Sequence, residues 1–297
     1  MLAAGTAALA ARAGASQEPV PRIARRPLGR MGFEASIYSL GTAEVPALDE
    51  TVEAIDLALD HGVNYIDTAP SYQERRAEQA VGVVAKRRRK DFFLATKTLA
   101  RDADGAFAEV RESLARLQCE TIDLLQVHAV NDEATLARVL GKGGALEGLD
   151  KARREGLIRH IGITGHTRPA VIAKALDEYP FESILVPISA ADHHLHDFAG
   201  DVVPKAVERG LAVAGMKSLK GVENHAGKVE DAAPFVRYAL SAPISTLTIG
   251  FRRISDVRAN LEIARSFTPM AAEQRAELER SVASWASADV LWWKRQA

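Results

Sequence analysis

The chain has 297 residues, of which 47% are hydrophobic and 26% are charged. This length can bury one large α/β barrel or two smaller domains. The 38 basic and 39 acidic residues leave a formal charge of −1, which gives no support for a nucleic-acid or anionic-membrane partner. The single cysteine, Cys119, excludes an intrachain disulfide and a multi-cysteine metal site, and we expect it to be a small buried hydrophobic residue.

The first 22 residues differ in composition from the rest: they are small and apolar, then polar with prolines. Ala13-Gly14-Ala15 is similar to a signal-peptidase cleavage site, but no basic residue precedes the apolar run. Two interpretations stay open, a disordered tail of a cytoplasmic protein or a truncated signal peptide of a protein exported to the periplasm. No run reaches about 18 apolar residues, so no membrane-spanning helix is predicted.

Beyond residue 22, short β-branched segments alternate with longer amphipathic ones, which predicts alternating strands and helices. The expected strands cover residues 37–42, 64–69, 92–98, 122–129, 160–165, 183–189, 211–217 and 245–251. Residues 25–35 predict a small hairpin that caps the closed end, and residues 272–288 a C-terminal helix.

Eight strand–helix units of roughly 25 to 30 residues predict an α/β fold of the (β/α)8 TIM-barrel type, with residues 23–297 as a single domain. An open doubly wound sheet is the rival architecture. It would normally bind a dinucleotide through a G-x-G-x-x-G turn after its first strand, and no such turn follows a predicted strand here.

Three consecutive predicted strands end in polar residues that can do chemistry. These are Asp67, Lys97 and His128, and Tyr72 follows Asp67 by five residues. Each alone has a structural explanation: a helix cap, a lysine that extends to solvent, or a hydrogen-bonded histidine. Together they are expected at one rim, because the carboxyl ends of barrel strands form the active-site face.

The chemistry of this set is coherent. A tyrosine has an ordinary pKa of about 10, and a neighbouring ammonium such as that of Lys97 lowers it. A buried lysine needs a counter-ion, which Asp67 would supply. The imidazole of His128 could orient a carbonyl oxygen or relay a proton. The set therefore suits protonation of a developing alkoxide.

Five segments in order, "GVNYIDTAPSY", "FFLATKT", "DLLQVHA", "GLIRHIGITGH" and "STLTIGFRRISDVRANL", resemble the aldo-keto reductase family, in a divergent bacterial-type branch with a GITGH motif. The resemblance covers about residues 26 to 266. It implies an NADPH-dependent oxidoreductase that reduces an aldehyde or ketone. Tyr72 would be the general acid, Lys97 would lower its pKa, Asp67 would pair with Lys97, and His128 would orient the carbonyl.

The same resemblance implies a nicotinamide cofactor site at the barrel mouth and an adenosine-phosphate loop in residues 250–260. NADPH is the expected cofactor, with NADH not excluded, because Arg252 and Arg253 could face a 2′-phosphate. The cofactor-binding residues expected are Gly41, Thr42, Thr164, Gly165, Ser189, Met216, Lys217, Gly250, Arg252, Arg253 and Asn260.

Several positions depart from the family pattern. Residues 164–165 replace the usual Ser-Asn pair, and His166 could substitute for the missing amide. Met216 stands where an aromatic ring often stacks on the nicotinamide, and Asp256 where many NADP-binding members carry Gln or Arg. Gln73 follows the tyrosine where glycine is common. These changes put cofactor affinity and NADP preference in question.

Residues 190–198 contain three histidines flanked by carboxylates, which could in principle hold a metal. Their spacing is not the i, i+4 helix geometry of H-E-x-x-H, so no metal is predicted and a substrate-facing loop is expected. Trp285, Trp292 and Trp293 are expected to pack on the barrel, with a place in the substrate pocket as the alternative.

Two other functions stay open: a non-catalytic nicotinamide-binding barrel that regulates a partner, and a barrel enzyme that uses Lys97 to form a Schiff base. The expected partner is a small-molecule carbonyl substrate. The sequence predicts neither its identity nor the oligomeric state, because specificity lies in variable loops.

Overall fold

The computed structural model describes residues 22–223 and 231–295, so the predictions for residues 1–21 lie outside the described residues. The strands are β1 (Arg25–Pro27), β2 (Glu34–Ser36), β3 (Tyr38–Gly41), β4 (Tyr65–Asp67), β5 (Phe93–Thr98), β6 (Ile122–Val127), β7 (Ile158–Thr164), β8 (Ser183–Pro187), β9 (Ala212–Met216) and β10 (Thr246–Ile249). The α-helices are α1 (Leu48–Asp60), α2 (Arg76–Arg88), α3 (Ala103–Leu117), α4 (Glu133–Leu140), α5 (Ala145–Arg154), α6 (Pro169–Glu178), α7 (Phe198–Asp201), α8 (Val203–Glu208), α9 (Lys220–Glu223), α10 (Ala233–Leu240), α11 (Ile254–Arg265) and α12 (Ala272–Val282).

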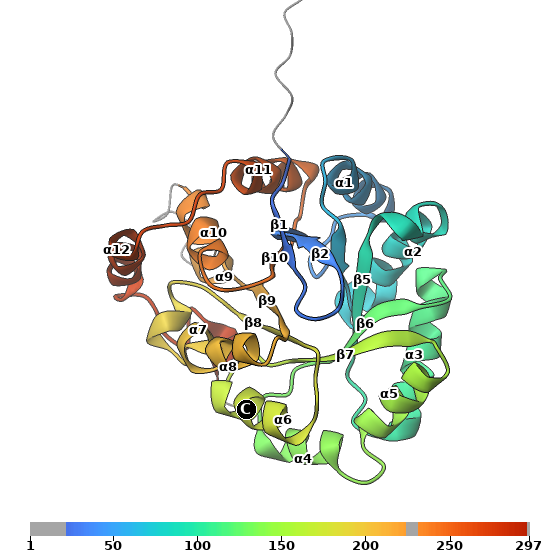
Figure 1. Ribbon diagram of the computed structural model, residues 1–297. Coiled ribbons are helices and arrows are strands. Elements are labelled where there is room, and N and C mark those ends of the chain that lie inside the picture. Colours follow the sequence, from blue (N-terminus) through green and yellow to red (C-terminus); the bar gives the residue numbers. More distant parts are fainter. Residues whose placement is uncertain (1–21, 224–230, 296–297) are drawn as a thin grey trace, which may run out of the picture.

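Eight parallel strands close into a barrel in the order β10-β3-β4-β5-β6-β7-β8-β9, and helices surround it (Figure 1). The predicted (β/α)8 fold is confirmed, and each predicted strand overlaps an observed one. The ring closes where β10 pairs with β3, with Leu247 opposite Tyr38.

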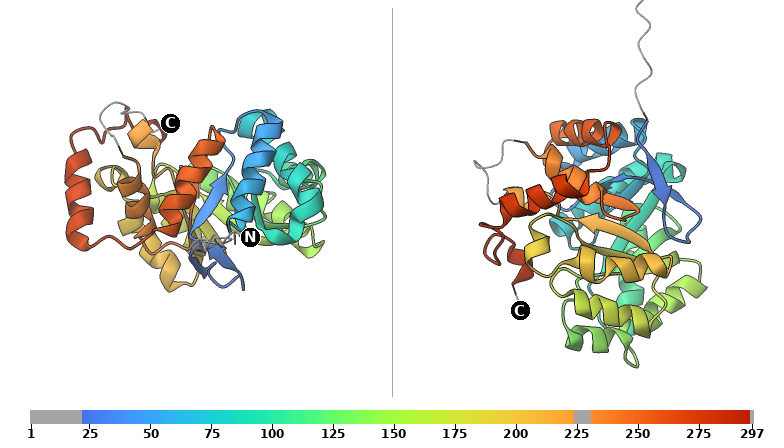
Figure 2. Two further views of the ribbon diagram at one scale, coloured as in Figure 1. Left: turned by 90° about the horizontal axis from the view of Figure 1, so that it is seen from above. Right: turned by 60° about the vertical axis from the view of Figure 1, so that its left-hand side comes forward.

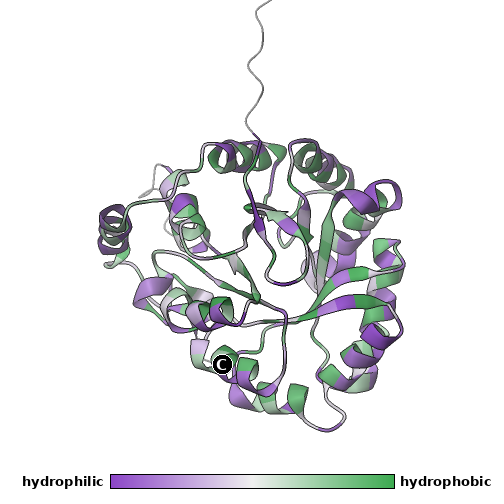
Figure 3. Cartoon of the chain, viewed as in Figure 1, coloured by the Kyte–Doolittle hydropathy of each residue, from purple (hydrophilic) through white to green (hydrophobic). Residues whose placement is uncertain are grey.

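Apolar side chains fill two layers, one inside the barrel and one between the strands and the helices. Tyr65, Phe93 and Leu124 belong to the inner cluster. The outer cluster is larger and includes Ile66, Leu125 and most of the inward faces of the helices. Figure 3 shows green strands at the centre and helices whose purple residues alternate with green ones, as expected for amphipathic helices that cover a barrel.

The antiparallel β1–β2 pair forms the predicted hairpin and closes the N-terminal end of the barrel. Leu28 belongs to the inner cluster, and Phe33 packs against it. Gly29 has a φ of +54°, and a Cβ there would lie 2.3 Å from the backbone nitrogen of Ala212. Only glycine therefore allows the hairpin to approach β9 this closely.

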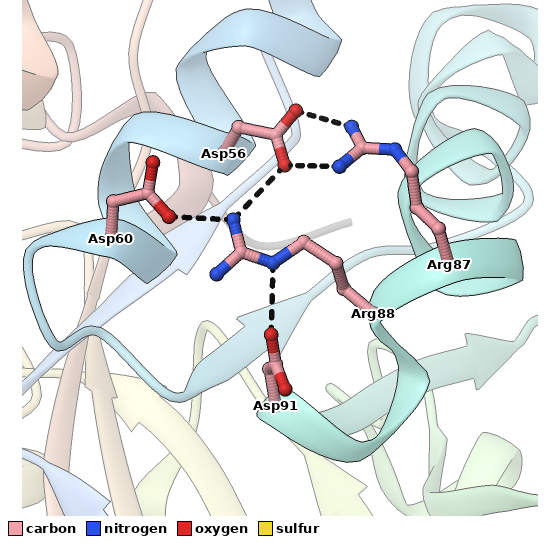
Figure 4. A network of polar contacts seen from close by, with 5 residues as sticks. All are labelled: Asp56, Asp60, Arg87, Arg88 and Asp91. Carbon is pink, nitrogen blue, oxygen red and sulfur yellow. Dashed lines mark hydrogen bonds and ion pairs between the residues drawn. The ribbon is translucent and has the colours of Figure 1, made fainter.

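Helix α2 is joined to α1 by arginines of the basic stretch 86–90. Arg87 pairs with Asp56, and Arg88 Nη1 lies 3.2 Å from Asp56 Oδ1 and 2.7 Å from Asp60 Oδ1. Arg88 Nε also lies 2.8 Å from Asp91, as Figure 4 shows. Exposed pairs of this kind contribute about 0–1 kcal/mol each, so the network orients two neighbouring helices more than it stabilises them.

The C-terminal segment folds back along one side of the barrel, where α12 lies next to α10 (Figures 1 and 2). Helix α12 ends at Val282, short of the predicted residue 288. Beyond it, Leu291 and Trp293 are buried in a third apolar cluster with Phe235 and Tyr238 of α10. The chain after Val282 is no longer α-helical, and this path places Leu291 and Trp293 against α10.

Among residues 22–223 and 231–295, no helix combines the length and the apolar composition needed to cross a bilayer. Cys119 is partly buried and packs against the outer cluster.

Candidate active site

The three polar strand-end residues meet at the carboxyl end of the barrel. Asp67 is the last residue of β4, Lys97 is the penultimate residue of β5, and His128 directly follows β6. The parallel register places Asp67 opposite Ala95 and Lys97 opposite Gln126. Neighbouring strands therefore hold the three side chains at one rim, as the barrel geometry predicts.

Lys97 and Asp67 form a buried ion pair. The Lys97 Nζ lies 2.5 Å from Asp67 Oδ1, and their side chains are only 1% and 3% exposed. Nζ also donates to the carbonyl oxygen of Thr68 at 2.9 Å. Gln126 Nε2 donates to the second carboxylate oxygen, Asp67 Oδ2, at 3.0 Å. Charge and hydrogen-bond partners together satisfy the pair, which a buried pair requires.

Sequence reasoning missed Gln126. Its position could have identified it. Gln126 lies two residues before His128, and alternate residues of a strand share a face. A polar residue at that position in a fully buried strand needs a partner, and Asp67 is the partner.

The ammonium of Lys97 also faces Tyr72, with Nζ 4.7 Å from the centre of the phenol ring. Burial acts to lower the pKa of Lys97, but Asp67 and Tyr72 outweigh burial and raise that pKa above its ordinary value. Lys97 is therefore a fixed positive charge at neutral pH.

The pKa of Tyr72 is raised, chiefly by burial, although Lys97 acts to lower it. The net direction is opposite to the predicted lowering, because removal from water disfavours the phenolate more than the ammonium favours it. Tyr72 consequently keeps its proton at neutral pH, which a proton donor must do.

The loop after Tyr72 has an unusual backbone. Gln73, Glu74 and Arg75 have φ values of 48°, 54° and 74°, all in the left-handed region. Each such non-glycine residue costs about 1–2 kcal/mol. This conformation explains why glycine suits the position of Gln73, and it is strain placed beside the phenol, as often occurs at functional sites.

His128 is 8% exposed. Its ring centre lies 6.0 Å from that of Tyr72 and 5.8 Å from that of His166. Burial, with Lys97 and other nearby cations, lowers the pKa of His128 to about 2. Arg101 Nη2 donates to the His128 carbonyl oxygen at 2.6 Å and fixes the loop. His128 is therefore a neutral imidazole that can donate one hydrogen bond.

His166 lies beside His128 and faces the same cavity. Burial and then Lys217 lower the pKa of His166 to about 3, so it too is neutral. Its backbone N–H donates to Asn131 Oδ1 at 2.7 Å, which holds the loop after β7.

These residues open into a cavity of about 910 Å³ at the barrel mouth. It is lined by Asp67, Tyr72, His128 and His166, and by eight of the expected cofactor residues: Gly41, Thr42, Met216, Lys217, Gly250, Arg252, Arg253 and Asn260. A second cavity of about 720 Å³ is lined by residues such as Arg30 and Glu182, and Asp67, Tyr72, His128 and His166 are not among its lining residues. The mouth is thus the candidate site.

Three expected cofactor residues are not among those lining this cavity. Thr164 is buried, and its Oγ1 accepts a hydrogen bond from the Ala129 N–H at 2.8 Å. Ser189 donates to Asp192 Oδ2 at 2.8 Å. A Cβ at Gly165 would lie 2.6 Å from the side chain of Ile172, so this residue packs against α6. In this structure the three hold the loops after β7 and β8.

Two carboxylates contact the cationic side of the cavity. Glu44 pairs with Lys220, and with Arg252, whose Nη2 lies 2.5 Å away. Asp256 lies 3.2 Å from Arg253 Nη2 and accepts from the N–H groups of Arg252 and Arg253 at 3.0 and 3.1 Å. The groups expected to bind a 2′-phosphate thus have protein partners, and Glu44 is a second residue that sequence reasoning missed.

The C-terminal segment completes the wall of the cavity. Trp292 lines it and is 54% exposed. The neighbouring Lys294 is buried, 2.9 Å from Asp192 Oδ1, and it donates to the His196 carbonyl oxygen at 3.0 Å. One tryptophan therefore faces the cavity while Trp293 packs in the core. The described ranges contain no group of three or more residues positioned to hold a metal ion, residues 190–198 included.

A (β/α)8 barrel with a buried Lys–Asp pair beside a tyrosine and a histidine at its mouth defines a class of oxidoreductases. The Aldo/keto reductase family model matches residues 37–287, and the chain belongs to this family.

The chain is 29% identical to the uncharacterized oxidoreductase YqkF of Bacillus subtilis, over 82% of this chain and 91% of that protein. It is 25% identical to L-galactose dehydrogenase of Arabidopsis thaliana, over 86% of each. The holo form of the aldo-keto reductase AKR11C1 from Bacillus halodurans superposes with a TM-score of 0.72 at 26% identity, over 87% of this chain and 96% of that one.

Proposed function

We propose that the protein reduces an aldehyde or ketone to an alcohol with a nicotinamide cofactor, and that Tyr72 is the general acid. The observation that carries the proposal is the geometry of four side chains. A buried Lys97–Asp67 pair lies under Tyr72, and the neutral His128 faces the same cavity.

The four side chains divide the work. The substrate carbonyl oxygen would lie between the Tyr72 hydroxyl and the imidazole of His128, which orients it through a neutral N–H donor. As negative charge develops on that oxygen, Tyr72 transfers its proton to it. The ammonium of Lys97 stabilises the phenolate that remains, because an opposite charge favours the ionised form. Asp67 and Gln126 keep Lys97 charged and in place.

The donor set at the mouth fits a nicotinamide dinucleotide. Lys220, Arg252 and Arg253 line the cavity and would hold phosphates. Gly41 and Gly250 lie close together at two neighbouring strand ends, where a Cβ on Gly41 would be 3.4 Å from the Gly250 nitrogen. The bound cofactor would supply a hydride to the carbonyl carbon. NADPH is proposed first and NADH is tested beside it, because Glu44 and Asp256 compete with a 2′-phosphate for these cations.

The test is a rate measurement. Oxidation of NADPH and of NADH would be followed with a panel of aldehydes and ketones, for the wild type and for Tyr72→Phe. The reverse reaction, with alcohols and NADP⁺ or NAD⁺, belongs in the panel because one relative is named a dehydrogenase. Turnover that needs Tyr72 supports the proposal. Nucleotide binding without turnover of any substrate would contradict it.

The Schiff-base alternative has weaker support. A lysine attacks a carbonyl as a neutral amine, whereas Asp67 keeps Lys97 ionised. Trapping with borohydride in the presence of a carbonyl substrate would reveal a covalent adduct if that alternative were correct.

A further inference from the structure

We propose that Lys217 binds an anionic group of the substrate, so that the preferred substrates are carbonyl compounds that also carry a carboxylate. The inference rests on the proposed function and adds a substrate class to it. Lys217 becomes a residue that determines specificity at the cavity wall.

The side chain of Lys217 is held by two indole rings. It follows β9 directly, and its Nζ lies 5.2 Å from the ring centre of Trp292 and 5.0 Å from that of Trp293. Aromatic faces attract a cation without neutralising it. The backbone of Lys217 has a φ of 63°, a left-handed conformation that lysine rarely adopts. The fold thus places an ammonium group firmly at the wall of the cavity.

The ammonium of Lys217 has no direct carboxylate partner among the described residues, and Asp192 and Glu44 act on its charge only from beyond salt-bridge distance. The other three lysine and arginine side chains that line the cavity are paired: Lys220 and Arg252 with Glu44, and Arg253 with Asp256. In the described part of the chain, no carboxylate forms a salt bridge with Lys217. A partly buried cation of this kind gains most from an anionic ligand, because a partner offsets the cost of removing it from water.

Lys217 lies within electrostatic reach of both sides of the cavity, because it acts on His166 and His128 and is itself acted on by Lys220 and Glu44. Its charge is the strongest charge effect on His166, and it also acts on His128. Both imidazoles are neutral, so they supply no positive charge for an anion. Burial, then Lys220, lowers the pKa of Lys217 to about 8, which leaves the ammonium largely charged at neutral pH. A carbonyl held by Tyr72 and His128 would have its remaining atoms near this ammonium.

A phosphate of the cofactor is the competing partner for Lys217. The substrate is favoured because Nζ lies against two indole rings and forms no salt bridge with Glu44, and because its charge acts on His166. The two partners are distinguished by experiment, since a substrate role predicts unchanged affinity for NADPH when Lys217 is replaced.

The first experiment compares the three isomers of formylbenzoate with their methyl esters, which keep the aldehyde and lose the charge. The wild type should show a kcat/KM at least about tenfold higher for one formylbenzoate than for its ester. Lys217→Met should lower that value by about 10- to 100-fold, as expected for loss of a charge-assisted hydrogen bond. The loss should be at least about tenfold larger for the formylbenzoate than for its ester, and Lys217→Arg should recover part of it.

Lys86→Met is the matched control. Lys86 is exposed on α2, outside the cavity, and its loss changes the net charge of the protein equally. Both substrates should keep their wild-type kcat/KM values in this variant. Equal losses for formylbenzoate and ester in Lys217→Met would overturn the proposal, as would a selective loss of NADPH affinity.

A binding measurement keeps the inference testable without turnover. Isothermal titration calorimetry with benzoate and with the uncharged benzamide needs no reaction. Benzoate should bind the full-length protein with NADP⁺ present, benzamide at least about tenfold more weakly, and Lys217→Met should bind the two alike. Similar affinities in the wild type would refute the anion site. Absence of carbonyl reduction together with Lys217-dependent benzoate binding would refute only the proposed function.

Discussion

Lys97 and Asp67 are joined across two neighbouring strands by an ion pair of 2.5 Å that is almost wholly removed from solvent. The pair is also the centre of a larger polar group, since Gln126 on the next strand reaches the same carboxylate. The proposed chemistry of the site and the stability of the barrel would therefore depend on the same atoms.

Replacement of Lys97 by methionine should destabilise the protein as well as inactivate it. Asp67 would remain as a buried carboxylate without its counter-ion, and removal of one partner of such a pair costs about 3–5 kcal/mol. Urea unfolding should show a lower midpoint for Lys97→Met. The double variant Asp67→Asn with Lys97→Met should recover much of the stability and none of the activity. An unchanged midpoint in the single variant would show that the pair contributes no net stability.

Tyr72→Phe should separate binding from chemistry. The hydroxyl is the proton donor in the proposed reaction, and loss of a general acid lowers kcat by about 10²- to 10⁴-fold. Phenylalanine keeps the ring beside Lys97 and His128, so nucleotide affinity measured by fluorescence titration should stay within about twofold of the wild type. A variant that retains a tenth or more of the wild-type kcat would exclude Tyr72 as the donor.

His128 should make the protein less stable in acid. Its pKa is lowered from an ordinary value of about 6.5 to about 2, so between these values the unfolded chain binds a proton that the folded protein does not. The free energy of unfolding should therefore fall as the pH drops below about 6.5, by about 1.4 kcal/mol per pH unit from this residue. Urea unfolding between about pH 5 and pH 7 measures the slope.

The variant His128→Asn should remove the contribution of His128 to the pH dependence of the free energy of unfolding. The control is His61→Asn, which removes another histidine, at the end of α1, and should leave that contribution in place. If His128→Asn unfolds with the same pH dependence as the wild type, then the folded protein binds a proton on His128 as readily as the unfolded chain does.

Glu44→Gln should change cofactor preference. Glu44 pairs with Lys220 and Arg252, and the amide would remove this carboxylate as a competitor of a phosphate for the two cations. We expect NADPH affinity to rise by about 5- to 10-fold and NADH affinity to rise less, because NADH lacks the 2′-phosphate. Fluorescence titration with both nucleotides tests this. An equal gain for the two would place the Glu44 ion pairs away from the 2′-phosphate.

The barrel could be predicted from the sequence because apolar strand segments and amphipathic helix segments alternate at a regular interval. Short apolar strands such as residues 92–98 and the glycine-terminated helices between them repeat with one rhythm. The polar ends of β4, β5 and β6 follow from that rhythm, since the carboxyl ends of parallel strands share a rim. Asp67, Lys97 and His128 could therefore be placed together without coordinates.

Pairings between distant loops could not be predicted in this way. Glu44 and Arg252 are separated by 208 residues along the chain, and no periodic pattern connects two loops. The raised pKa of Tyr72 is also a property of burial, which depends on the packing of the whole mouth. The burial of Lys294 could not be predicted either, because lysines are rarely buried and the sequence around this one does not indicate that it is an exception.

The barrel is a ring with one seam between the beginning and the end of its strand order, where β3 meets β10 and Ser39 Oγ lies 2.9 Å from Thr248 Oγ1. The loops that leave the two strands at this seam carry Glu44 and Arg252, on the side of the cavity proposed for the dinucleotide phosphates. A bound dinucleotide would contact the loops after β3 and β10 at the same time, and would hold the first and last barrel strands together. A folding chain would therefore bind the nucleotide only after β10 has paired with β3. Nucleotide binding would thus be a measure of barrel closure during folding.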